Sequence, residues 1–258
     1  MCDTTAFIVP IYTKHISYGK KMLLSRKHTD NEHIPLIFGC STIEECNTLY
    51  DGALELGIEN FSTVYIPCDH IGNKAIYKKY YLLQKCMTKY EYIACIDAET
   101  VFVKHIPVKK LKERANRPLL YGSIIESEIN KQCASHFDTL LPECSRIYFW
   151  FSDLCVYRST ILHKFFDRFP SIDKLSEHYN NFEYIMYIYF ILSSSNDTVI
   201  PEFIETNTGW SLENCSEEPL MNLYEQGDEL PLWVCPETYG KMNLMFRTRF
   251  YLLYHLDR

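Results

Sequence analysis

The segment YIACIDAETVFV, residues 92–103, decides how the fold of this chain is interpreted. Apolar residues predominate from Tyr92 to Ile96, Asp97 and Glu99 follow one residue apart, and an apolar run resumes at Val101. A carboxylate that leaves water without a partner costs several kcal/mol, so two of them do not belong inside a buried strand. The segment therefore predicts a buried strand that ends at Asp97, with both acids at the edge of a sheet.

Strand and helix patterns alternate up to this segment. Near-continuous apolar runs predict strands, and apolar residues three and four positions apart predict helices. The expected strands are residues 5–12, 34–40, 61–67 and 91–97, and the expected helices are residues 19–28, 41–57 and 73–90. Ser41 and Glu44 have the spacing of a capping box that opens the second helix, and Gly57 is a suitable C′ residue.

This order predicts an α/β fold with a mainly parallel central sheet and helices on both faces. Ligands of such sheets bind at the carboxyl ends of the strands, where Asp97 falls. The second half is less regular, with expected strands at 118–125, 146–157 and 197–201 and expected helices at 127–141, 160–169 and 174–193. From about residue 202 the chain turns polar. Because no repeat or linker interrupts it, we expect one domain over residues 1–258.

Composition and charge exclude several classes of protein. The formal net charge of −7 argues against a nucleic-acid partner, which requires a basic surface. The basic pairs at Lys78–Lys79 and 109–112 are interpreted as solvated helix faces. The 11 cysteines include no CxxC pair and no metal-ligand spacing, which favours a reduced protein. No signal peptide is expected, and the longest apolar stretch, Tyr184–Leu192, is too short for a transmembrane segment, so we expect a cytoplasmic location.

The spacing of Asp97 and Glu99 indicates a cation. Two carboxylates on the same side of a strand end repel each other unless a cation joins them. Carboxylate oxygens suit hard ions such as Mg²⁺ or Mn²⁺, which complete their coordination with water and substrate phosphate. A metal-bridged diphosphate is therefore the natural ligand of this pair.

The stretch IYKKYYLLQKCMTKYEYIACIDAETVFV, residues 76–103, resembles the core of the GT-A nucleotide-sugar glycosyltransferases, whose DxD motif follows a hydrophobic strand in this way. The glycogenin and galactosyl-transferring branch is the most similar, and the resemblance extends over residues 5–195. It implies a GT-A (Rossmann-like) fold and a Mn²⁺- or Mg²⁺-dependent transfer of a hexosyl or pentosyl group. The donor is expected to be a UDP-sugar, and the acceptor a hydroxyl group of a glycan or another molecule.

Two features depart from the family pattern. The second acid is Glu99 in place of an aspartate, which lengthens its reach by one methylene group. The late His-x-x-Gly-x-x-Lys-Pro-Trp segment, which supplies a third metal ligand in the glycogenin branch, has no match in this sequence. The resemblance thus implies Asp97 and Glu99 as metal ligands and leaves the third ligand open, with His255 as the candidate.

The resemblance also implies donor-binding residues. Pro10, Tyr12 and Thr13 follow the first strand, where these enzymes receive the base and ribose, although plain strand and loop packing is the alternative for each. Lys79 matches a lysine turned toward the donor, against the alternative of a solvated helix lysine. Asp97 and Ala98 are expected to contact the nucleotide.

The remaining candidates lie later in the chain. Ser152 and Asp153 interrupt an apolar run that resembles the acceptor-side strand, and Glu183 begins an apolar helix, where the macrodipole favours an anion. In an inverting enzyme, Glu183 or Asp153 would take the proton of the acceptor hydroxyl. Two further residues are expected to close over the diphosphate, because guanidinium groups pair bidentately with phosphate: Arg247 and Arg249.

Two other functions are compatible with such a fold. A sugar nucleotidyltransferase shares the sheet and a metal-binding acid, but it would carry a glycine-rich phosphate loop after the first strand. Only Gly19 occurs there. A non-catalytic carbohydrate-binding or scaffold protein would keep the fold without metal-dependent nucleotide binding.

Overall fold

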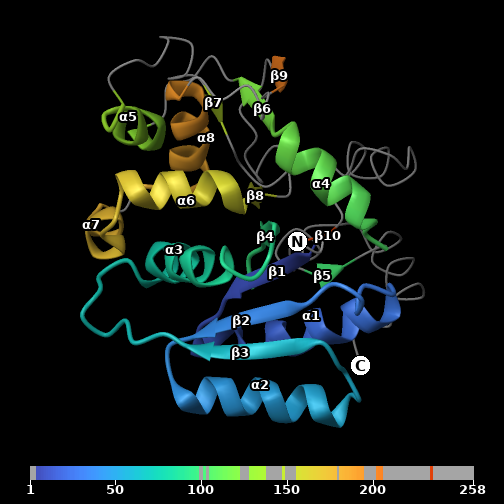
Figure 1. Ribbon diagram of the computed structural model, residues 1–258. Coiled ribbons are helices and arrows are strands. Elements are labelled where there is room, and N and C mark those ends of the chain that lie inside the picture. Colours follow the sequence, from blue (N-terminus) through green and yellow to red (C-terminus); the bar gives the residue numbers. More distant parts are fainter. Residues whose placement is uncertain are drawn as a thin grey trace, which may run out of the picture.

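The structure is a computed structural model that describes residues 4–98, 101–102, 105–122, 128–137, 147–148, 155–178, 180–194, 202–205 and 233–234 (Figure 1). Its central sheet has the strand order β3-β2-β1-β4-β8. The strands are β1 (Thr5–Pro10), β2 (Leu36–Cys40), β3 (Phe61–Tyr65), β4 (Tyr92–Cys95) and β8 (Cys155–Arg158). The first four run parallel and β8 pairs antiparallel with β4, which confirms the expected mainly parallel sheet.

The strand order reverses beside β1. The chain proceeds outward from β1 to β2 and β3 and then returns to place β4 on the other side of β1. Phe7 on β1 is consequently aligned with Leu36 on β2 and with Ala94 on β4. Such a reversal is the topological switch point of an open α/β sheet, and ligands bind outside the carboxyl ends of the strands there. The carboxyl ends of β1 and β4 therefore define the first place to look for a site.

Helices cover both faces of the sheet (Figure 1). Phe7 and Val9 on β1 belong to one apolar core, together with residues of α1 (Ile16–His28), α2 (Ile43–Glu55) and α4 (Val108–Asn116). Ala6 and Ile8 belong to the other. The helices that contribute to this second core are α3 (Lys74–Cys86), α5 (Glu128–Ala134), α6 (Ser159–Arg168), α7 (Ile172–Glu177) and α8 (Glu183–Ser193). Burial on both faces explains why the strands are apolar throughout.

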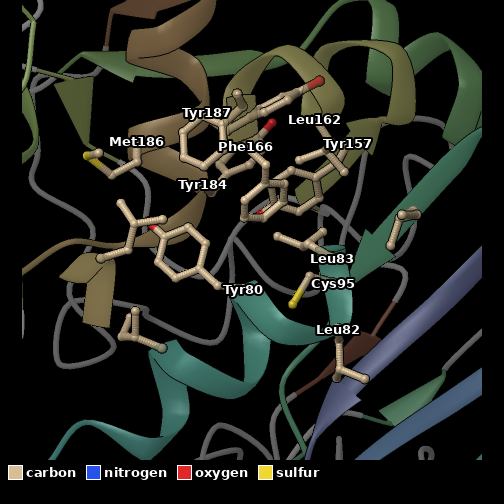
Figure 2. Packing of buried hydrophobic residues seen from close by; sticks show 14 of the residues in the cluster. Tyr80, Leu82, Leu83, Cys95, Tyr157, Leu162, Phe166, Tyr184, Met186 and Tyr187 are labelled. Carbon is tan, nitrogen blue, oxygen red and sulfur yellow. The ribbon is translucent and has the colours of Figure 1, made fainter. Parts of the chain in front are cut away.

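The second core is rich in aromatic rings (Figure 2). Tyr80 on α3 stacks on Phe165 with ring centroids 6.2 Å apart, and Tyr157 on β8 meets Tyr187 on α8 edge to face at 4.9 Å. Every residue of α8 from its first position to Ile191 is buried, so its apolar sequence reflects packing inside the protein. Within the described ranges, no helix is long and apolar enough to cross a membrane.

Two small sheets accompany the central one. β5 (Val101–Phe102) pairs antiparallel with β10 (Trp233–Val234). β6 (Leu119–Gly122) lies between β7 (Ile147–Tyr148), which is antiparallel to it, and β9 (Glu202–Glu205), which is parallel. A short 3₁₀ helix, η1 (Thr13–His15), connects β1 to α1. No disulfide joins the cysteines within the described residues, which are Cys40, Cys46, Cys68, Cys86, Cys95, Cys133 and Cys155.

The start of α2 lies one residue later than the sequence spacing predicts. Thr42, rather than Ser41, is the N-cap, and it forms a capping box with Glu45 in place of Glu44. The side chain of Glu45 is the reason, because it is buried and accepts hydrogen bonds from the backbone of Ser41 at 2.6 Å and from Thr13 Oγ1 at 2.7 Å. The other end agrees with expectation, since Gly57 has φ +61° and follows the helix.

Other boundaries also differ from the sequence pattern. The expected helix at 174–193 is two helices, α7 and α8, which are separated near Asn181. The side chain of Asn181 donates to the carbonyl of Leu175 at 3.0 Å, and the backbone carbonyl of Asn181 accepts from Tyr80 Oη at 3.1 Å, so the break is fixed by hydrogen bonds. The expected strand at 146–157 contains β7 and the first part of β8, and residues 149–154 lie outside the described ranges.

Arg26 joins the chain segments at the amino ends of β2 and β3, on the side of the sheet away from the switch point. Its guanidinium is fully buried and donates to backbone carbonyls around the starts of β2 and β3, those of Asn31, Glu32, Ile34, Glu59 and Asn60. Burial lowers the pKa of Arg26 to about 10, against an opposing effect of Glu32. A buried cation of this kind is stable only because carbonyl oxygens replace its water.

Candidate functional site

Asp97 lies at the carboxyl end of β4. The backbone N–H of Ile96 donates to the carbonyl of Ile8 at 3.0 Å, so pairing with β1 continues for one residue beyond the strand. Ile96 is buried, whereas the side chain of Asp97 is 50% exposed. The carboxylate thus emerges at the first position that leaves the sheet, where it keeps contact with water. Ala98, the next residue, packs in the apolar core with Phe102.

Lys79 on α3 joins Asp97 to a second carboxylate. Its Nζ lies 3.0 Å from Asp97 Oδ1 and 3.1 Å from Glu183 Oε1, and its side chain is only 14% exposed. Burial by itself would lower the pKa of Lys79, but the carboxylates of Asp97 and Glu183 reverse this effect and hold that pKa well above its ordinary value. The ammonium therefore stays charged at neutral pH.

Glu183 is the first residue of α8, and its side chain is 4% exposed. The positive end of the helix macrodipole and the ammonium of Lys79 both lie beside its carboxyl group. Its other oxygen, Oε2, is buried and has no hydrogen-bond partner in the described part of the chain. The pKa of Tyr157 on the neighbouring strand β8 is raised well above its ordinary value by burial and, next, by the charge of Glu183. Because buried carboxylate oxygens are normally hydrogen-bonded, Oε2 is available to a ligand or to a part of the chain outside the described ranges.

The three residues form a group with a net charge of −1. Two carboxylates share one ammonium. Lys79 lies on α3, Asp97 follows β4, the next element of the chain, and Glu183 begins α8, far along the sequence. Burial favours complete neutralisation, so the remaining negative charge resides best on Asp97, the member with the largest contact with water. The group can therefore accept a further cation on its exposed side.

The end of β1 forms the neighbouring part of this edge. Pro10 is buried as the last residue of the strand, and the N–H of Ile11 donates to the carbonyl of Gly39 at 2.9 Å. Tyr12 is half-buried, and Thr13 is exposed while its hydroxyl donates to Glu45 Oε1. These residues lie at the switch point, as the sequence predicts for the donor-binding residues, and their contact with a nucleotide remains a prediction.

Lys78 is a residue of this edge that the sequence reasoning missed. It is fully buried, its ammonium donates to the carbonyl of Ile11, and Nζ lies 4.1 Å from the centroid of the Tyr12 ring. Burial lowers the pKa of Lys78, and Glu45 partly offsets this effect. The interaction fixes the Tyr12 ring by a cation–π contact.

The interpretation of Lys78 and Lys79 as a solvated helix face is therefore wrong. Both residues reach oxygen atoms at the edge of the sheet, Lys78 beside β1 and Lys79 beside β4. A signal for Lys79 is present in the sequence, because it lies three residues after Ile76 and four before Leu83, within the apolar face of the helix.

Several predicted site residues lie outside the described ranges: Glu99, Ser152, Asp153, Arg247, Arg249 and His255. Within those ranges, no group of three or more His, Cys, Asp or Glu residues is arranged to hold a metal ion. Of the predicted metal ligands, Asp97 lies within the described ranges, and Glu99 and His255 lie outside them. This is compatible with Mg²⁺ or Mn²⁺, which bind through as few as one or two carboxylates when substrate phosphate and water complete their coordination.

Comparisons with known proteins concern the fold. No protein-family model and no curated protein matches the sequence. Among solved structures, the apo form of the bifunctional glycosyltransferase WbbM is similar over 90% of this chain, with a TM-score of 0.51 and 10% identity. This chain spans 45% of the WbbM chain. The similarity, together with the observed sheet, confirms the expected GT-A-type α/β fold.

Two further structures are more distantly similar. TarS of S. aureus (residues 1–349) has a TM-score of 0.44 and 10% identity, with 79% of this chain and 60% of TarS covered. The galactosyltransferase LgtC, in complex with donor and acceptor sugar analogs, has a TM-score of 0.46 and 11% identity, with 76% of this chain and 72% of LgtC covered.

Proposed function

We propose that this chain is a glycosyltransferase that moves a sugar from a nucleotide-diphosphate sugar to a hydroxyl group of a glycan or other acceptor. The fold that it shares with WbbM supports glycosyl transfer in general. The observation that carries the proposal is the ion-paired group of Asp97, Lys79 and Glu183 at the carboxyl ends of the strands. Parallel α/β sheets bind their ligands at this edge.

The donor would lie across the ends of β1 and β4. Tyr12, fixed by Lys78, offers an aromatic ring against which a base can pack. Pro10 and Thr13 complete the proposed site for base and ribose, and the diphosphate would lie toward Asp97 and Ala98. Arg247 and Arg249 remain proposed partners of the diphosphate, because a guanidinium pairs with two phosphate oxygens. We take a UDP-sugar as the donor to test first.

Asp97 would be the metal ligand within the described chain, with Glu99 and His255 as further proposed ligands. Its half-exposed carboxylate can bind Mn²⁺ or Mg²⁺ on the side away from Lys79. When bound, the ion neutralises charge on the diphosphate as it leaves. Lys79 holds the side chain of Asp97 in one orientation, so the ligand oxygen is positioned before the donor arrives.

Glu183 would act on the acceptor side. In an inverting enzyme it takes the proton of the attacking hydroxyl group, and in a retaining enzyme it borders the face of the transferred sugar. Lys79 pairs with Oε1 of Glu183. Its Oε2 has no hydrogen-bond partner among the described residues and can accept a hydrogen bond from a substrate hydroxyl. Asp153 remains the other proposed base, with Ser152 beside it.

The proposal is tested by turnover with a panel of nucleotide sugars, measured as release of nucleoside diphosphate with Mn²⁺ and with a chelator. One donor should be consumed, and Asp97→Asn should lower its turnover about 100-fold or more, because the leaving group loses electrostatic stabilisation. Asp167→Asn, at an exposed position of α6, is the matched control and should retain full activity. A panel without any turnover, or an Asp97→Asn variant as active as the control, would contradict the proposal.

A further inference from the structure

The outer side of α2 exposes large apolar side chains. In the described part of the chain, the exposed large hydrophobic residues are Ile43 at 63%, Tyr50 at 49%, Leu54 at 58% and Tyr65 at 46%. Three of them lie on α2, and the fourth is the last residue of β3, the edge strand next to it. Single exposed apolar residues are ordinary, but a group confined to one helix and the adjoining strand indicates a contact surface.

The exposed residues of α2 form a seam along the helix. Ile43, Tyr50 and Leu54 are separated by seven and four residues, and exposed Asn47 occupies the position between the first two. This spacing is that of the a and d positions through which one helix packs against another. It extends over about 16 Å. The opposite side of α2, with Leu49, already packs against the sheet, so the seam is a second apolar side that folding of the described residues leaves open.

The edge strand widens this surface. The ring of Tyr50 lies 5.5 Å from that of Phe61 on β3, so helix and strand are in contact there. Tyr65 is aligned with Cys40, the residue at which β2 ends shortly before α2 begins. Figure 1 shows α2 as the outermost helix on this side, with β3 running above it. The exposed apolar surface thus consists of one side of α2 together with Tyr65 at the end of β3.

The charged residues of α2 are all acidic, and the lysines that α1 brings to it, Lys20 and Lys27, lie at Gly52 and at the carbonyl of Leu56. Glu44, Asp51 and Glu55 are exposed, and α2 contains no lysine, arginine or histidine. Antiparallel packing of two copies of α2 would bring these carboxylates toward one another, which is unfavourable. A partner with basic residues beside its apolar side chains would instead pair with them. Charge therefore favours a basic partner over a second copy of this chain.

We propose that the outer face of α2, defined by Ile43, Tyr50, Leu54 and the acidic flank, binds an amphipathic helix with an apolar seam and lysine or arginine residues beside it. Burial of the exposed side chains supplies the affinity, and the acidic flank sets the orientation and excludes acidic partners. The surface lies on a different part of the sheet from Asp97 and Glu183, so this inference does not depend on the proposed function.

The test uses two synthetic peptides with the same leucine seam, one with lysine and one with glutamate at the flanking positions. Binding to the full chain is measured by fluorescence anisotropy at low and high salt. We expect the lysine peptide to bind and the glutamate peptide to bind at least tenfold more weakly. Leu54→Glu, at a solvent-exposed position that should not disturb folding, should weaken binding of the lysine peptide about tenfold or more. His163→Glu on α6 adds the same charge at an exposed position elsewhere and should have no effect.

A charge-reversal variant completes the test. Glu44→Lys combined with Asp51→Lys should shift the preference from the lysine peptide to the glutamate peptide, which nonspecific attraction to an acidic protein does not predict. Equal binding by wild type and Leu54→Glu would overturn the proposal. A dimer in sedimentation experiments that Leu54→Glu dissociates would overturn it in favour of a second copy of this chain.

Discussion

Replacement of Lys79 by methionine tests the energetics of the site most sharply. Lys79 is the ammonium that the structure places 3.1 Å from the carboxylate of Glu183, and both side chains are largely buried. Loss of one partner from a buried ion pair leaves the other charge without compensation, which costs about 3–5 kcal/mol. Asp97 adds little to this loss, because its side chain is half exposed and water can replace the ammonium.

The change is measured as the free energy of unfolding in urea at neutral pH. We expect Lys79→Met to lose about 3–5 kcal/mol, whereas Lys85→Met, an exposed position on the same helix, should stay within about 0.5 kcal/mol of wild type. The double variant Lys79→Met, Glu183→Gln should recover part of the loss, because no buried charge is then left unpaired. Equal losses in the two methionine variants, or no recovery in the double variant, would show that Lys79 and Glu183 do not form a stabilising buried ion pair.

The same variant has a distinct dependence on pH. In the wild type, the pKa of Lys79 is raised well above its ordinary value, so the stabilisation by its charge is complete at neutral pH and is lost only as the pH rises through that raised pKa. The deficit of Lys79→Met relative to wild type should therefore be constant around neutral pH and narrow as the pH rises through the raised pKa of Lys79. A deficit that persists above that pKa would indicate lost packing in place of lost charge.

Three further substitutions test how the fold is held. Arg26→Met should lower the free energy of unfolding by about 3 kcal/mol, because several buried carbonyl groups lose their donor, and chemical denaturation measures this. Thr42→Ala should cost about 1 kcal/mol through loss of the N-cap, whereas Ser41→Ala should cost less; similar losses would contradict the observed capping box. Gly39→Val should lower the melting temperature by several degrees, because even a Cβ there would lie 2.8 Å from Ile66 and Leu82.

The sheet and its helices follow from local patterns. Alternating apolar runs and helical spacings up to Asp97 predict the first four strands and the three helices between them, because the period of the apolar residues reflects burial directly. The edge position of Asp97 also follows from the sequence, since a strand that is buried on both faces cannot hold a carboxylate.

The arrangement of the site does not follow from such patterns. The sequence suggests Lys79, Asp97 and Glu183 for separate roles, and only the packing of α3 and α8 against β4 brings them into one ion-paired group. The burial of Lys78 likewise depends on a carbonyl at the end of β1. Contacts between elements far apart in the chain decide these features, and local periodicity carries no information about them.

The capping box of α2 shows the same limit on a smaller scale. Two hydroxyl residues and two glutamates occur side by side, so the required spacing fits Ser41 with Glu44 and Thr42 with Glu45 equally well. The hydrogen bond from Thr13 to Glu45 selects the second pair. A tertiary contact thus decides between two local alternatives of similar propensity.

The proposed function requires Asp97 to hold a divalent ion against the diphosphate of a nucleotide. Calorimetric titration of UDP into the protein, with Mn²⁺ and with a chelator, measures this requirement. We expect the wild type and Asp167→Asn to bind UDP only with Mn²⁺, and Asp97→Asn not to bind it. Binding that is indifferent to Mn²⁺, or that survives in Asp97→Asn, would contradict this requirement.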